Sequence, residues 1–91
     1  MSVEIQVPTV LRVHTGGARK VEVEGDTVAA VIASLDSTYP GLRTELLTDE
    51  GTVRQFVNIY VNDEDIRYLD RLNTKLADGD RVAILPAVAG G

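Results

Sequence analysis

The residues best placed to do chemistry are the last five of the chain: Ala87, Val88, Ala89, Gly90 and Gly91. Glycine has no Cβ, so the two terminal glycines can pass through a gap that any side chain would block. An extended segment of this length spans about 16–18 Å, enough to reach an active site of another protein while the body stays outside. We therefore predict a flexible tail, residues 87–91, that presents the carboxylate of its last glycine to a partner.

No other residues in the sequence combine into a catalytic or metal site. The chain has one histidine, His14, and no cysteine, which excludes thiol nucleophiles, disulfide bonds and thiolate metal sites. The acidic run Asp63-Glu64-Asp65 lacks the glycine and glutamate spacing of a calcium-binding EF-hand loop. We expect no catalytic residue, no bound metal and no bound cofactor. If the chain handles sulfur, its terminal carboxyl group is the group that would carry it.

Composition predicts one small domain that works with protein partners. The 91 residues carry a net charge of −5, and their longest basic run is Arg19-Lys20. Nucleic-acid binding needs a basic face and is not expected. No run approaches the roughly 18 apolar residues of a membrane span, and no signal-peptide pattern is visible, so we expect a cytoplasmic protein that is monomeric when free. The negative charge favours partners with a basic docking surface.

The first half of the chain predicts a β-hairpin followed by a helix. Apolar residues alternate over 3–7 and 20–24, which indicates two half-buried strands. Residues 27–38 show helical spacing, with Asp26 or Thr27 available as the N-cap. Two further expectations are a second short helix over 42–47 and a continuation of the first strand beyond Pro8 through Val10, Leu11 and Val13.

The second half predicts the rest of the sheet. The strongest strand spans 56–62, and the last strand runs from Arg81 to Leu85 and stops at Pro86, which lacks an N–H for the ladder. Between them we expect a short edge strand at Ile66-Arg67 and a helical crossover around Leu69, Leu72 and Leu76. This element order indicates the α+β class: a β-grasp (ubiquitin-like) roll over residues 1–86, with a mixed sheet, one main helix across one face and the last strand at the centre.

Strand alternation also predicts a docking surface beside the tail. If Val57, Ile59, Val61, Val82 and Ile84 face the core, their neighbours face away from it. An apolar patch next to a reactive tail is a candidate for partner contact. Its predicted members are Phe56, Tyr60 and Leu85, with Ala83 between them.

Several stretches resemble the ubiquitin-like sulfur carriers of the ThiS/MoaD type, and most of all the actinobacterial, CysO-like carriers of cysteine biosynthesis. They are residues 8–12 (PTVLR), 14–17 (HTGG), 56–65 (FVNIYVNDED) and 84–91 (ILPAVAGG). The resemblance covers essentially the whole chain. The Asn-Asp-Glu-Asp turn at residues 62–65 and the Leu-Pro-Ala-Val-Ala-Gly-Gly end are specific in combination, whereas the end alone is shared with molybdopterin-synthase small subunits.

The resemblance implies a reaction cycle in which this chain is a co-substrate. An ATP-dependent adenylating enzyme would activate Gly91, and a sulfur donor would convert it to a thiocarboxylate. With Ala87–Gly90 threaded into its active site, a pyridoxal-phosphate-dependent cysteine synthase that uses O-phosphoserine would accept the sulfur. A JAMM-type zinc metalloprotease would then release cysteine. ATP, pyridoxal phosphate and every catalytic residue would belong to the partners.

Three alternatives remain open from the sequence. A molybdopterin-synthase small subunit would use the same thiocarboxylate on a different acceptor. A ubiquitin-like modifier would join Gly91 to lysines of target proteins. A plain β-grasp interaction domain would have a chemically inert Gly-Gly end.

Overall fold

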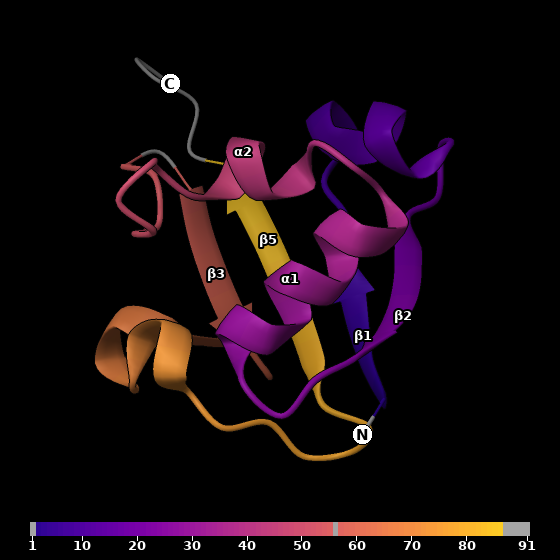
Figure 1. Cartoon of the computed structure of the whole chain (residues 1–91). Helices are drawn as coiled ribbons and strands as arrows, with labels where there is room; N and C mark the ends of the chain where they lie inside the picture. The colour runs from indigo at the N-terminus through magenta and orange to yellow at the C-terminus, as the bar shows by residue number, and fades with distance from the viewer. Residues whose placement is uncertain (1, 56, 87–91) are drawn as a thin grey trace.

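The computed structural model describes residues 2–55 and 57–86, and these form a five-stranded mixed sheet in the order β2-β1-β5-β3-β4 (Figure 1). Strands β1 and β2 form an antiparallel hairpin, β5 runs parallel to β1, and β3 runs antiparallel to both β5 and β4. The last strand therefore lies at the centre of the sheet, as predicted for a β-grasp roll. The strands are β1 (Ser2–Gln6), β2 (Lys20–Glu24), β3 (Val57–Val61), β4 (Glu64–Asp65) and β5 (Arg81–Pro86).

Helix α1 (Val28–Thr38) lies across one face of this sheet (Figure 1). It begins where the Thr27 side chain accepts a hydrogen bond from the backbone N–H of Ala30, which satisfies a donor that the first turn leaves free. The shorter helix α2 (Leu42–Leu46) follows at the same side. Both helices were predicted. The buried stripe of α1 consists of Val28, Val31, Ile32 and Leu35.

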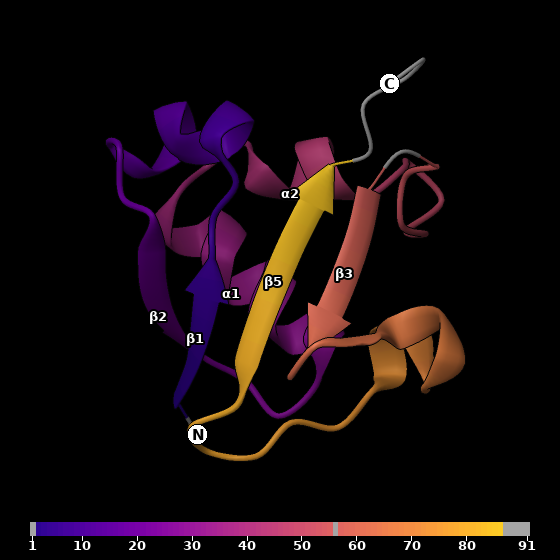
Figure 2. The ribbon, with the colours of Figure 1, turned by 180° about the vertical axis from the view of Figure 1, so that it is seen from behind.

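The core lies between α1 and the inner face of the sheet. Every strand except the two-residue β4 contributes alternate apolar side chains to it, so one face of the sheet is covered and the other is open (Figure 2). The most deeply buried strand residues are Val3 and Ile5 of β1, Ile59 of β3, and Val82 and Ile84 of β5. Val57, which was also predicted to face the core, is partly buried and packs against it.

Two predicted strand segments are instead helical turns. The chain after β1 forms a 3₁₀ helix, η1 (Thr9–Thr15), so the expected continuation of the first strand is wrong. Within η1 Leu11 is buried, whereas Val10 and Val13 are 66% and 81% exposed. A 3₁₀ helix has three residues per turn, which separates Leu11 from the other two apolar side chains.

The predicted edge strand at Ile66-Arg67 is displaced by two residues. Asn62 and Asp63 both have positive φ, of 50° and 72°, and make a tight two-residue turn. The edge strand β4 therefore comes directly after it, and Ile66 opens a 3₁₀ helix, η2 (Ile66–Tyr68). The expected crossover helix reduces to one more 3₁₀ turn, η3 (Arg71–Asn73).

Candidate functional site

The structure places the root of the tail at one end of the central strand. Pro86, the last described residue, pairs with Val57 at the start of β3. Because β5 is parallel to β1, the carboxyl ends of both strands lie at the same edge of the sheet (Figure 2). The predicted site residues Ala87, Val88, Ala89, Gly90 and Gly91 lie outside the described residues, as does Phe56. The boundary between domain and tail stays a prediction.

Tyr60 and Leu85 both lie on the open face of the sheet. Tyr60 pairs with Ala83, and Leu85 pairs with Asn58, while Ile59 and Ile84 between them are buried on the helix side. The Leu85 side chain is 50% exposed. The structure thus brings together these two members of the predicted docking patch. Their role in partner binding stays a prediction.

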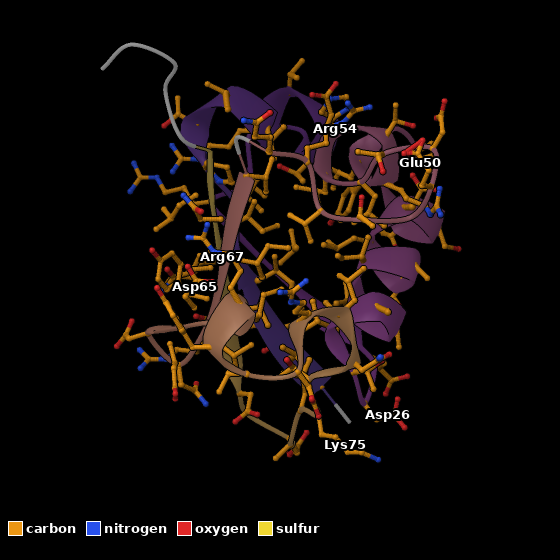
Figure 3. All side chains as sticks on the ribbon, turned by 90° about the vertical axis from the view of Figure 1, so that its left-hand side faces the viewer. Asp26, Glu50, Arg54, Asp65, Arg67 and Lys75 are labelled. Carbon is orange, nitrogen blue, oxygen red and sulfur yellow. The ribbon has the colours of Figure 1, made fainter. Side chains whose placement is uncertain are left out.

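An ion pair that the sequence did not reveal borders this patch. Asp65, opposite Tyr60 in the β3–β4 ladder, accepts hydrogen bonds from Nη2 and Nε of Arg67 at 2.7 and 3.1 Å (Figure 3). The Arg67 side-chain hydrogen bonds, followed by one from its backbone N–H, lower the pKa of Asp65, and the same contact raises the pKa of Arg67. The acidic run Asp63-Glu64-Asp65 therefore contributes one residue to a turn and one to an ion pair. Beside the pair, Tyr68 is 82% exposed.

Three basic residues meet at the same edge as the tail root. Arg12, Arg19 and Lys20 line a pocket of about 300 Å³ together with Pro8 and Leu85. The sequence suggested no basic cluster larger than Arg19-Lys20, and the structure corrects this. Arg12 joins them because η1 turns the chain back over the end of β1, and its Nε donates a hydrogen bond to the carbonyl oxygen of Val7 at 3.1 Å.

The single histidine of the chain lies near a glutamate of helix α2. Nε2 of His14 lies 3.9 Å from a carboxylate oxygen of Glu45, at the limit of an ion pair. No group of three metal-ligating side chains occurs within residues 2–55 and 57–86. A pocket of about 380 Å³ beside β3 is lined by Arg54, Arg67 and Arg71, among others. In the same part of the chain, no helix has the length and hydrophobicity to cross a bilayer.

Comparison with known proteins decides which family this fold and tail represent. The family model of the ThiS family matches residues 5–91, which includes the terminal glycines. The chain belongs to the ThiS family. The relative with the highest identity given below is a sulfur carrier protein, a small protein that carries sulfur for enzymes rather than a catalyst.

Two relatives and one solved structure are similar to this chain. The chain is 52% identical over 93 aligned residues to the sulfur carrier protein CysO of Mycobacterium tuberculosis, with both chains fully covered. It is 43% identical over 65 residues to the small archaeal modifier protein 3 of Haloferax volcanii, covering 71% of this chain and 70% of that one. It also matches a chain in the crystal structure of the BexX/CysO complex of Amycolatopsis orientalis, with a TM-score of 0.92, 45% identity and coverage of 98% and 99%.

Proposed function

We propose that this chain is a sulfur carrier of cysteine biosynthesis, and that the terminal carboxyl group of Gly91 carries the sulfur. The observation that supports this most is the 52% identity to a CysO sulfur carrier over the full length of both chains. The fold is consistent with the role because the central strand β5 leads directly into the Gly-Gly end.

Activation of the carboxylate is the first chemical step. A carboxylate is a poor electrophile, because it is negatively charged and stabilised by resonance. A partner enzyme would transfer AMP from ATP to the Gly91 carboxylate and release pyrophosphate, which gives the carbonyl carbon a good leaving group. A sulfur donor then attacks that carbon, AMP departs, and a thiocarboxylate remains. Its sulfur is anionic at neutral pH, unlike a thiol with a pKa of about 8.5.

Delivery of the sulfur is the second step. A pyridoxal-phosphate-dependent cysteine synthase that uses O-phosphoserine would hold the acceptor, and the cofactor would supply the electronic activation. O-Phosphoserine would lose its phosphate, and the Gly91 sulfur would bond to the carbon that carried it, which joins carrier and cysteine as a thioester. Transfer of the acyl group from this sulfur to the cysteine amine would free the thiol and give a more stable amide. A JAMM-type zinc metalloprotease would hydrolyse that amide and return the carrier with its carboxylate.

The folded body supplies the affinity that threading the tail requires. Fixing a backbone residue costs about 1–2 kcal/mol, so ordering residues 87–91 in a channel costs on the order of 5–10 kcal/mol. Contacts of the folded surface must offset this loss. Tyr60 and Leu85, beside the tail root on the open face, are the side chains we assign to this contact.

Adduct formation tests this proposal. Thiocarboxylated protein is mixed with the cysteine synthase and O-phosphoserine, and the intact mass is measured. We expect the mass of the carrier with cysteine attached to Gly91, and no adduct from a chain lacking Gly90 and Gly91. Absence of an adduct from the thiocarboxylated chain, with transfer to a molybdopterin-synthase large subunit instead, would replace the proposed acceptor.

A second candidate function is protein modification, which the identity to the small archaeal modifier protein 3 favours. In that case Gly91 would form isopeptide bonds with lysines of other proteins. Tagged protein expressed in its host would then appear in a ladder of covalent conjugates that depends on Gly91. A single free carrier band, with thiocarboxylate on Gly91, supports the carrier role instead.

A further inference from the structure

The edge of the sheet at which β5 ends carries a second surface, formed by η1 and the start of β2. The parallel pairing of β1 and β5 places the chain that follows β1 beside the end of β5 (Figure 2). Leu85 of β5 and Arg12 of η1 accordingly line the same pocket. Any partner that receives the tail must approach this edge.

The charge of this edge is opposite to that of the whole chain. Arg12, Arg19 and Lys20 line one pocket, in a protein with a net charge of −5. Arg19 and Lys20 are exposed and Arg12 is partly buried. None of them forms an ion pair within residues 2–55 and 57–86, where the two pairs are His14–Glu45 and Asp65–Arg67. Their charges are therefore available to a partner.

The far half of the open face has the opposite sign. Glu4 of β1 lies directly across from Glu22 of β2, and Glu24 follows at the end of the same strand. Arg81 of β5 pairs with Glu4 on the other side, so three carboxylates and one guanidinium leave this half with a net negative charge. Like charges opposite one another in a ladder are unfavourable. The open face is thus divided into an acidic half around Glu4 and a basic end at the tail root.

Helix η1, which carries Arg12, also presents two exposed valines. Val10 and Val13 of η1 are 66% and 81% exposed, and they are three residues apart. Side chains at this spacing eclipse in a 3₁₀ helix, so both lie on one side of η1. Exposed apolar side chains on the same short helix as Arg12 are candidates for contact with a partner protein.

We propose that this surface, the tail-edge collar (Val10, Arg12, Val13, Arg19 and Lys20), docks on a carboxylate-lined mouth of the channel that receives the tail. The inference rests on the proposed function and names the partner chemistry that the carrier recognises. The collar cations attract the acidic mouth, and the acidic half of the open face turns away from it, so the charge pattern orients the carrier with its tail toward the channel.

Charge reversal at the two lysines tests the collar with a matched control. Lys20 lies in the collar, whereas Lys75 lies near the opposite end of the molecule, before β5 (Figure 3). Both lysines are exposed, so K20E and K75E make the same charge change without disturbing the core. The association rate constant with the cysteine synthase is measured by stopped flow, at low and at high salt. Urea unfolding of each variant verifies its stability.

We expect K20E to lower the association rate constant about tenfold at low salt and K75E to change it less than about twofold, with the difference lost at high salt. A second variant, V13S, should raise the dissociation rate constant while the association rate constant stays the same. If the wild type binds and K20E and K75E have equal association rate constants, the collar proposal is wrong and the proposed function stands. If the wild type fails to bind the cysteine synthase at every concentration tested, both the proposed function and the collar proposal are wrong.

Discussion

Truncation of Leu85 is the substitution that most sharply separates a docking residue from an ordinary surface residue. Full burial of a leucine side chain contributes about 1.5–3 kcal/mol. Leu85 is 50% exposed in the free protein, so a partner that covers it gains about half of this. L85A should therefore weaken binding to the cysteine synthase by about 1 kcal/mol, which is about fivefold in Kd.

Isothermal titration calorimetry with the carboxylate form of the chain measures this Kd without interference from sulfur transfer. Leu69 provides a matched control, because it is a leucine with 36% exposure that lies between η2 and η3, outside the predicted docking patch. L69A should bind as the wild type does. Equal affinities of L85A and wild type, or equal losses in L85A and L69A, would refute the assignment of Leu85 to the interface.

Three further predictions concern the stability of the fold. T27A should lower the free energy of unfolding by about 1 kcal/mol, because the N-cap of α1 is lost, and T27S should restore most of it in urea titrations. G25A should cost about 1–3 kcal/mol, because a Cβ there would lie 2.8 Å from Cγ2 and 2.9 Å from the backbone nitrogen of Val31; an unchanged urea midpoint would contradict this. D65N should make the free energy of unfolding less sensitive to acid. The pKa of Asp65 is lowered in the folded state, so the ionised carboxylate stabilises the fold at a pH above its unfolded pKa of about 3.9. This stabilisation is lost as the pH falls through the folded-state pKa. Urea midpoints from about pH 6 to pH 2 should fall less steeply for D65N than for wild type, and parallel profiles would show that the Asp65–Arg67 pair contributes nothing.

The sheet and the main helix were predictable because each depends on a local repeat. Ile59 and Val61 alternate with polar residues, and Val82 and Ile84 alternate with residues that are smaller or more exposed. Each pattern allows only one face of its strand to point toward the core. The helical stripe beginning at Val28 is equally unambiguous. The central position of β5 followed from the order of these elements.

The parts that sequence reasoning missed depend on contacts between distant segments or on special backbone angles. Val10, Leu11 and Val13 are residue types that favour strands, and only the 3₁₀ geometry of η1 shows that Val10 and Val13 are exposed. Arg12 joins Lys20 because β1 and β5 are parallel and η1 folds over their shared edge. The position of β4 depends on the positive φ of Asn62 and its neighbour.

The state of the Gly91 carboxyl group tests the central claim most directly. The chain has no cysteine, so a thiol-alkylating reagent has no thiol side chain to label. Protein purified from its native host during growth without cysteine should be labelled once, and fragmentation of the C-terminal peptide should place the label on Gly91. Host-derived protein that stays unlabelled under these conditions, with an intact mass matching a plain carboxylate, would contradict the account.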